Sequence, residues 1–268
     1  MKKIFQFLGL LTIAVSFSGN IEAAHHKDAL LDAVNNPERN VNYSARDNYR
    51  NPYETLSFFQ IKPTMHVLEL SAGGGWYTEI LAPYLEPLGK LSVTHHNPEA
   101  GSYYKRSRNS NDEKVKSNPL FKGVQVITAD VPPSKPFTQP GTQDLVVTFR
   151  NLHNWLGQDA MKAIMQEAYN SLKDGGHFGV VEHRAPVGSD LEFMKKSGYV
   201  TQSLAIQTAE EVGFKLVASS EINANPKDTA DHPKGVWTLP PSFRLKDQDR
   251  AKYAAIGESD RMTLLFKK

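Results

Sequence analysis

Three residues able to take part in catalysis follow one short apolar segment of this 268-residue chain. The segment 144–149 reads Asp-Leu-Val-Val-Thr-Phe, and Arg150, Asn151 and His153 come directly after it. A histidine titrates near neutral pH and can take a proton from a hydroxyl or an amine. An arginine can hold a carboxylate or a phosphate through two parallel hydrogen bonds. We therefore predict a catalytic group in which His153 is the base, Arg150 binds an anion and Asn151 orients the substrate.

The same residues also allow a structural interpretation. His153 and Asn154 can cap a following helix, and Trp155 can pack in the core. Trp155 can alternatively stack on a cation or an aromatic substrate. Both interpretations stay open at the level of the sequence.

A second polar run follows the apolar segment 178–181. Glu182 and His183 can orient His153 or form a salt-linked wall with Arg150, and a purely structural network fits equally well. Only the fold can bring these histidines and carboxylates together, so the sequence predicts no metal site.

Three consecutive glycines at 73–75 follow a short apolar strand at 66–70 and precede a segment with helical spacing. Glycines in this place let the backbone turn tightly and approach a ligand closely. A phosphate-binding loop needs Gly-Lys-Ser/Thr, which the following Trp76 and Tyr77 exclude. A dinucleotide fingerprint needs a third glycine at position 78, where the chain has threonine.

The remaining pattern resembles motif I of class I S-adenosylmethionine-dependent methyltransferases. The usual acid-x-Gly-x-Gly-x-Gly maps onto Glu69, Ser71, Gly73 and Gly75, with serine in place of the first glycine. Asp130 stands after the third strand, where the family has an acid that binds the adenine amino group. The resemblance implies S-adenosylmethionine as the cofactor, bound by Glu69, Ser71, Gly73, Gly74, Gly75, His95 and Asp130.

Four further segments extend the resemblance over residues 62–268. Lys-Asp-Gly-Gly at 173–176 is similar to the family's turn before the fifth strand. The segments 73–81, 149–155 and 256–261 resemble a group of bacterial, often exported predicted methyltransferases.

The end of the second strand departs from the family. It reads Thr-His-His-Asn at 94–97, where the family has a carboxylate for the two ribose hydroxyls. A neutral histidine accepts one hydrogen bond and offers no bidentate carboxylate. His95 is nevertheless the residue at this strand end that we expect at the cofactor.

The spacing of apolar residues predicts alternating strands and helices. Apolar runs predict strands at 66–70, 91–94, 124–128, 144–149, 178–181, 214–218 and 262–266. Three- and four-residue repeats predict helices at 28–34, 52–59, 76–85, 158–172 and 200–212. Such alternation favours an α/β fold with a doubly wound, mostly parallel seven-stranded sheet of the Rossmann-like methyltransferase type. Residues 24–61 form an N-terminal helical cap and residues 222–261 a long loop-rich insertion before the last strand, all within one domain.

The composition and the first residues of the chain indicate which partners and which cellular location to expect. A net charge of +2 gives no basic field for nucleic acid, and the absence of cysteine excludes disulfides and a lipidated cysteine. Residues 1–23 combine two lysines, an apolar run and a small residue, the layout of a secretory signal peptide. We therefore expect a periplasmic or secreted protein without a stable membrane anchor after cleavage; the oligomeric state stays open.

These observations predict a methyltransferase that acts on a small molecule outside the cytoplasm. One alternative is an exported binding protein that keeps the fold and has lost or changed its cofactor and activity. A nicotinamide-dependent oxidoreductase is a weaker alternative, because Thr78 breaks the dinucleotide pattern.

Overall fold

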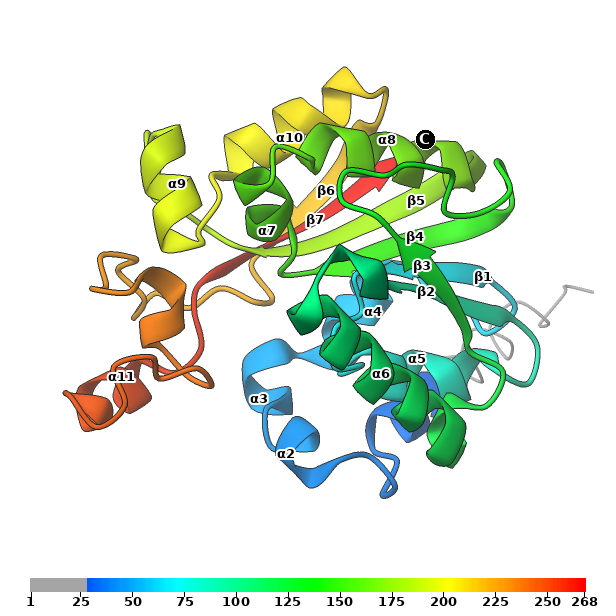
Figure 1. Cartoon of the computed structure of the whole chain (residues 1–268), viewed down its shortest axis with the longest axis horizontal. Coiled ribbons are helices and arrows are strands. Elements are labelled where there is room, and N and C mark those ends of the chain that lie inside the picture. Colours follow the sequence, from blue (N-terminus) through cyan, green and yellow to red (C-terminus); the bar gives the residue numbers. More distant parts are fainter. Residues whose placement is uncertain (1–27) are drawn as a thin grey trace, which may run out of the picture.

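Seven strands form a single sheet at the centre of the protein (Figure 1). They are β1 (His66–Leu70), β2 (Lys90–His96), β3 (Gln125–Ala129), β4 (Gln143–Phe149), β5 (Leu172–His183), β6 (Lys215–Ser220) and β7 (Arg261–Lys267). The order across the sheet is β3-β2-β1-β4-β5-β7-β6. The first five strands pair in parallel, while β7 runs antiparallel to both β5 and β6. The predicted mostly parallel, seven-stranded sheet is confirmed.

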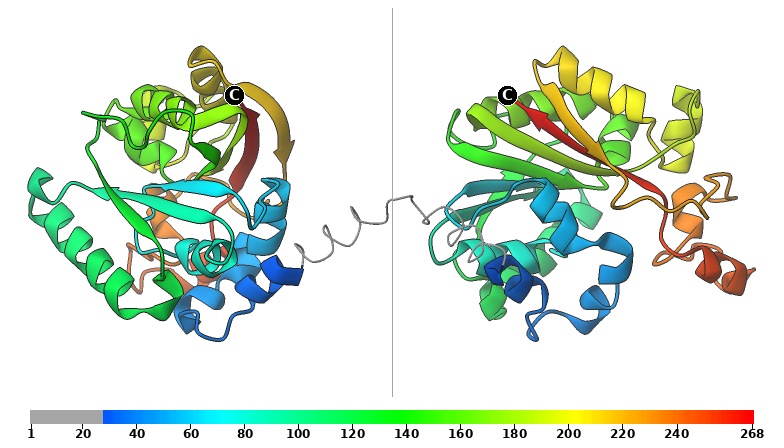
Figure 2. Two further views of the ribbon diagram at one scale, coloured as in Figure 1. Left: turned by 90° about the vertical axis from the view of Figure 1, so that its right-hand side faces the viewer. Right: turned by 180° about the vertical axis from the view of Figure 1, so that it is seen from behind.

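Helices cover both faces of the sheet, as Figure 2 shows from two further directions. In chain order they are α2 (Val41–Ser44), α3 (Asp47–Arg50), α4 (Pro52–Phe58), α5 (Thr78–Leu85), α6 (Ser102–Ser117), α7 (Leu152–Gly157), α8 (Met161–Ser171), α9 (Leu191–Ser197), α10 (Gln202–Glu211) and α11 (Arg250–Ile256). Residues 28–34 are also helical. The structure describes residues 28–268 and is a computed structural model; the predicted signal peptide at 1–23 lies outside the described residues.

Each face of the sheet has its own hydrophobic cluster. Helices α7, α8, α9 and α10 contribute to the first cluster, and the helix at 28–34, α4 and α5 contribute to the second. Helix α8 shows why the sequence pattern was informative: Met161, Ile164, Met165 and Ala168 repeat at helical spacing, and all are buried. β1 and β4 are buried almost throughout because both of their faces are covered.

The strand order reverses between β1 and β4, which lie side by side. Chain crossovers leave these strands in opposite directions, so a crevice opens at their carboxyl ends. The N-terminal cap and the 222–261 segment, orange to red in Figure 1, flank this end of the sheet. Within residues 28–268, no helix combines the length and the apolar character needed to cross a bilayer.

Candidate active site

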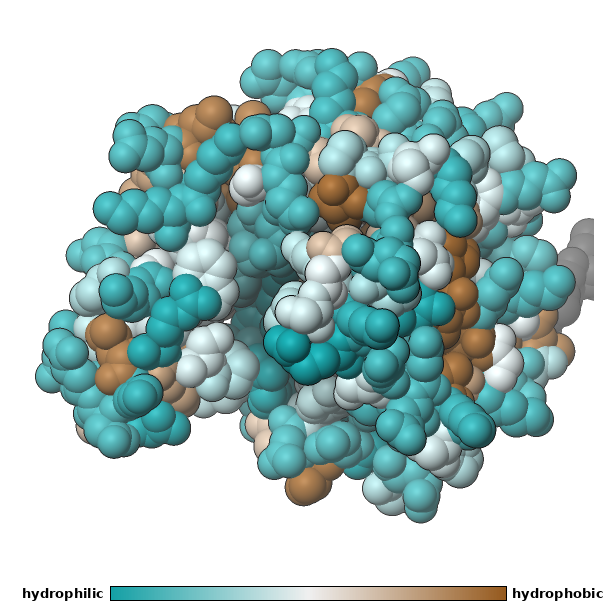
Figure 3. All heavy atoms as spheres, viewed as in Figure 1, coloured by the Kyte–Doolittle hydropathy of each residue, from teal (hydrophilic) through white to brown (hydrophobic). Residues whose placement is uncertain are grey.

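A cavity of about 330 Å³ lies at the carboxyl ends of β1 and β4. The glycine turn, the residues after β4, the N-terminal cap and the 222–261 segment all contribute to its wall. Figure 3 shows a hollow lined mainly by hydrophilic residues between that segment and the rest of the protein. Residues of both the N-terminal cap and the 222–261 segment therefore flank the site.

The glycine turn reaches the cavity through Ser71, Gly73 and Gly74. Ser71 takes the left-handed backbone conformation, with φ of 52°, which a glycine adopts more easily. Its N–H donates to Thr94 Oγ1 at 2.8 Å, which fixes this conformation. Gly73 has φ of 59°, and a Cβ added there would meet no atom closer than Ser71 O at 3.9 Å. The Cβ position of Gly73 is therefore open space that a ligand can use.

At the other two positions of the turn, a side chain would come too close to neighbouring residues of the protein. A Cβ on Gly74 would lie 2.7 Å from the Tyr43 hydroxyl, which donates to the Gly74 carbonyl at 3.0 Å. A Cβ on Gly75 would lie 3.0 Å from the ring of Phe121. Gly75 does not line the cavity and packs against Phe121, so its contact with the cofactor stays a prediction.

Arg150 and Asn151, directly after β4, line the cavity and are fixed by hydrogen bonds to neighbouring strands. Arg150 has φ of 62°, and its N–H donates to Val181 O at 2.7 Å. The side-chain amide of Asn151 donates to Leu70 O at 3.2 Å and to Thr148 Oγ1 at 3.1 Å. Asn151 therefore ties the end of β1 to the end of β4, and the structure makes it a positioning residue. Backbone strain at Arg150 is the kind that proteins keep at functional sites.

His153, at the start of α7, pairs with the fully buried carboxylate of Glu182. Its Nδ1 lies 3.0 Å from Glu182 Oε1, and its backbone N–H donates to Glu182 Oε2 at 3.3 Å. The contact of Nδ1 with Glu182 leaves Nε2 available, an arrangement that suits His153 as a proton acceptor. It is the contact that the predicted orienting role of Glu182 requires.

His183 completes the polar wall beside this pair. Its ring centroid lies 5.2 Å from that of His153, and its Nδ1 lies 2.5 Å from Ser259 Oγ. Burial lowers the pKa of His183 well below its usual value, and the positive charges of Arg150 and other arginines lower it further. His183 is therefore uncharged at neutral pH and contacts Ser259 as a neutral imidazole.

Potential ligand atoms of His153, Glu182 and His183 all lie within 4.8 Å of one another, a spacing that a metal ion can bridge. The carboxylate of Glu182 already accepts from three N–H groups, two of His153 and the backbone N–H of His183. Nearby arginine charges also oppose a divalent cation. The contacts favour a hydrogen-bonded proton acceptor over a metal site.

Trp155 is not placed where it could stack on a ligand. Trp155 is only 2% exposed and does not line the cavity, so stacking on a ligand was wrong and core packing is correct. Its indole N–H donates to Ser71 Oγ at 3.3 Å, which connects α7 to the glycine turn. Trp237, in the 3-10 helix η3 (Gly235–Thr238), lines the cavity instead.

An arginine cluster on the opposite wall was missed by the sequence analysis. Arg46 Nε donates to Glu258 Oε1 at 2.6 Å, and Arg50 Nε donates to Glu258 Oε2 at 3.2 Å. Burial alone would raise the pKa of Glu258, but Arg50, Arg261 and Arg46 hold it at about 2. More than 200 residues separate the partners, so the only sequence signal was the four-residue spacing of the two arginines.

Glu69 lies behind the glycine turn and does not line the cavity, so its contact with the cofactor stays a prediction. Its Oε2 accepts a hydrogen bond from Thr78 Oγ1 at 2.6 Å, so it fixes the start of α5 against β1. Burial raises the pKa of Glu69 from 4.5 to about 8, against the opposing effects of Thr78 and Arg150.

This raised pKa predicts a pH-dependent stability. Between pH 4.5 and 8 the unfolded chain releases the Glu69 proton while the folded chain keeps it, so the free energy of unfolding falls as pH rises. Glu69→Gln should remove this contribution and make the variant more stable relative to wild type at pH 8 than at pH 5. Urea denaturation at both pH values measures the difference, with the exposed Glu210→Gln as control. Equal pH dependence in wild type and Glu69→Gln would contradict the assignment.

A second cavity, of about 280 Å³, lies at the ends of β2 and β3 and includes Asn97 and Asp130. Asp130 Oδ1 accepts from Asn97 Nδ2 at 2.6 Å. His95 lines neither of these two cavities: its Nε2 lies 3.2 Å from Gly73 O, and its Nδ1 has no partner among residues 28–268. Burial lowers the pKa of His95 to about 4, so the residue in this position is a neutral imidazole.

Comparison with known proteins finds a family model that matches the segment holding the glycine turn and the residues after β4. Residues 68–180 match the family model described as "Methyltransferase domain". The match runs from β1 into β5, less than half of the chain, and supports the predicted resemblance to class I S-adenosylmethionine-dependent methyltransferases. A comparison with curated proteins found no match.

Several solved structures share this methyltransferase fold. An S-adenosylmethionine-dependent methyltransferase from Aquifex aeolicus is 15% identical, with a TM-score of 0.56 over 83% of this chain and 92% of that one. Geranyl diphosphate methyltransferase in complex with S-adenosylmethionine is 9% identical, with a TM-score of 0.54 over 88% and 94%. The [4+2]-cyclase SpnF is 14% identical, with a TM-score of 0.56 over 94% and 96%.

The methyltransferase family supports S-adenosylmethionine as the cofactor, and the site residues fit it. Gly73 leaves open the space that a Cβ would fill, and Asp130 stands at the end of β3 in the second cavity. These residues would hold the methionine and adenine ends. At the end of β2, where the family has a carboxylate for the ribose hydroxyls, this chain has His95, which lines neither cavity. We therefore expect a weaker contact with the ribose.

Proposed function

We propose that this protein transfers a methyl group from S-adenosylmethionine to a hydroxyl or amine of a small molecule, outside the cytoplasm. The observation that carries the proposal is the His153–Glu182 pair, which lies beside the glycine turn of a methyltransferase domain. The basic and apolar residues of 1–23 support export of the chain.

Different residues of the chain would accept the proton, position the reacting groups and enclose the cavity. The bound cofactor supplies a methyl group on a sulfonium, a ready electrophile. His153 Nε2 takes the proton of the acceptor, and Glu182 stabilises the imidazolium that forms. Ser71, Gly73 and Asn151 fix the position of the turn, so that catalysis draws mainly on alignment of the reacting groups. Trp237 and the rest of the 222–261 wall restrict access of water to the cavity.

Calorimetric titration of residues 24–268 with S-adenosylmethionine and S-adenosylhomocysteine tests the proposal. We expect saturable binding of both with one site per chain. Absence of saturable binding for either compound would contradict the proposal.

The neutral His95 favours one alternative, an exported binding protein that has kept the fold without methyl transfer. This alternative predicts ligand binding but no transfer of a labelled methyl group to any acceptor. Transfer that is lost when His153 is replaced would exclude it.

A further inference from the structure

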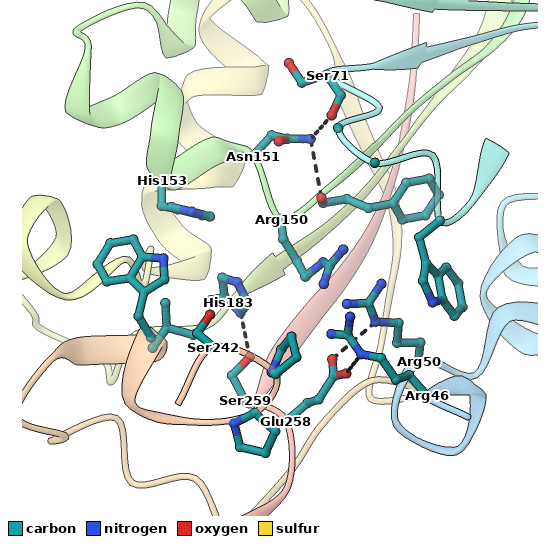
Figure 4. Close-up of a pocket in the computed structure, with 18 of the residues that line it drawn as sticks. Arg46, Arg50, Ser71, Arg150, Asn151, His153, His183, Ser242, Glu258 and Ser259 are labelled. Carbon is teal, nitrogen blue, oxygen red and sulfur yellow. Dashed lines mark hydrogen bonds and ion pairs between the residues drawn. The ribbon is translucent and has the colours of Figure 1, made fainter. Parts of the chain in front are cut away.

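The cavity has more positive than negative groups. Arg46, Arg50 and Arg150 line it together with one carboxylate, that of Glu258 (Figure 4). Arg261 lies behind the cavity wall, with its Nη1 at 3.3 Å from Glu258 Oε2. The carboxylate of Glu258 therefore forms ion pairs with three arginines. Among the described residues, Arg150 has no carboxylate partner of its own.

Several N–H groups of these arginines donate no hydrogen bond within the described residues. Among the described residues, Arg46 Nη2 and Arg50 Nη1 are buried and have no hydrogen-bond partner. The side chain of Arg50 is only 2% exposed, and its guanidinium lies 4.6 Å from the centre of the Trp76 ring. Within residues 28–268, no group is hydrogen-bonded to the Arg150 guanidinium, which points into the cavity in Figure 4. Buried donors without acceptors are costly to a fold, and functional sites are where proteins keep them.

We propose that these arginines bind a carboxylate or phosphate group of the methyl acceptor, with Arg150 and Arg50 as the donors. The identification of the ligand as the acceptor rests on the proposed function; the anion site itself does not. A planar guanidinium matches both anions through paired hydrogen bonds, and the desolvated cavity strengthens each of them.

Charge and position favour the acceptor over the cofactor as the source of this anion. S-adenosylmethionine has a carboxylate, but its sulfonium and amino groups make its net charge positive, so a cationic cavity repels it unless a further anion is present. Arg150 also lies three residues from His153, and both side chains line the same cavity. An acceptor held through its acidic group at Arg150 would present a hydroxyl or amine towards His153.

Binding of inorganic phosphate, at constant ionic strength, tests the anion site directly. We expect phosphate to raise the melting temperature of the wild-type protein saturably. Arg150→Gln should weaken this binding roughly 10- to 100-fold, since charge-assisted hydrogen bonds are lost. The matched control is Arg106→Gln, which removes an exposed arginine on α6 and should bind phosphate as wild type does.

A second titration separates the two sources of the anion. 5′-Methylthioadenosine lacks the carboxylate that S-adenosylhomocysteine carries. If the acceptor supplies the anion, Arg150→Gln binds both compounds within about threefold of wild type. Weaker S-adenosylhomocysteine binding with unchanged methylthioadenosine binding would assign the arginines to the cofactor and overturn the proposal.

The remaining outcomes are equally decisive. No saturable effect of phosphate on the wild type, or unchanged phosphate binding by Arg150→Gln, would overturn the anion site. Phosphate binding without S-adenosylhomocysteine binding would support the anion site while contradicting the proposed methyl transfer.

Discussion

Replacing Gly73 by valine is expected to weaken S-adenosylhomocysteine binding more than about 100-fold, a change of over 2.7 kcal/mol. The Cβ position of Gly73 faces open cavity, so a branched side chain would fill the space left for the ligand. The backbone φ of 59° adds strain for any residue with a Cβ. Calorimetric titration measures the loss, and circular dichroism checks that the variant is folded.

Gly157→Val is the matched control for this variant. A Cβ at Gly157 meets no atom within 4 Å, and the residue is exposed at the end of α7. We expect its affinity for S-adenosylhomocysteine to stay within threefold of wild type. Wild-type affinity in a folded Gly73→Val variant would show that the ligand does not occupy this turn.

Replacing His153 by glutamine is expected to lower the rate of methyl transfer roughly 10²- to 10⁴-fold, the usual contribution of a general base. Binding of S-adenosylhomocysteine should change less than threefold, because the proposed role of His153 is at the acceptor and not at the cofactor. The assay follows a labelled methyl group into a panel of hydroxy acids, amino acids and phosphate monoesters.

Two further variants sharpen this result. Glu182→Gln keeps the size of the side chain but removes the charge that fixes the His153 tautomer, so it should also slow transfer with little effect on cofactor binding. His177→Gln changes a histidine in the middle of β5, which does not line the cavity, and should be as active as wild type. A His153→Gln variant with wild-type transfer rates would exclude the proposed base.

The sequence predicted the strands and the groups at their ends because these depend on local patterns. Apolar runs located β1, β4 and β5, and the polar residues at the carboxyl ends of β4 and β5 do meet, as shown by His153 and Glu182. Parallel neighbouring strands place their carboxyl ends at one edge of the sheet, so this meeting follows from topology.

The parts of the site that the sequence missed depend on contacts between distant segments. Arg46 and Arg50 meet Glu258 only because the N-terminal cap and the 222–261 segment close over the same edge. Glu69 fitted the family motif, yet the pleat of β1 turns its side chain to Thr78, away from the cavity. Spacing along the chain could not distinguish these orientations.

A crystal structure of residues 24–268 with S-adenosylhomocysteine would show whether the glycine turn binds the cofactor. We expect the ligand with its homocysteine end at Gly73, its adenine near Asp130 and its sulfur facing the cavity shared by Arg150 and His153. A ligand bound elsewhere, with the space beside Gly73 empty at saturating concentration, would contradict this expectation.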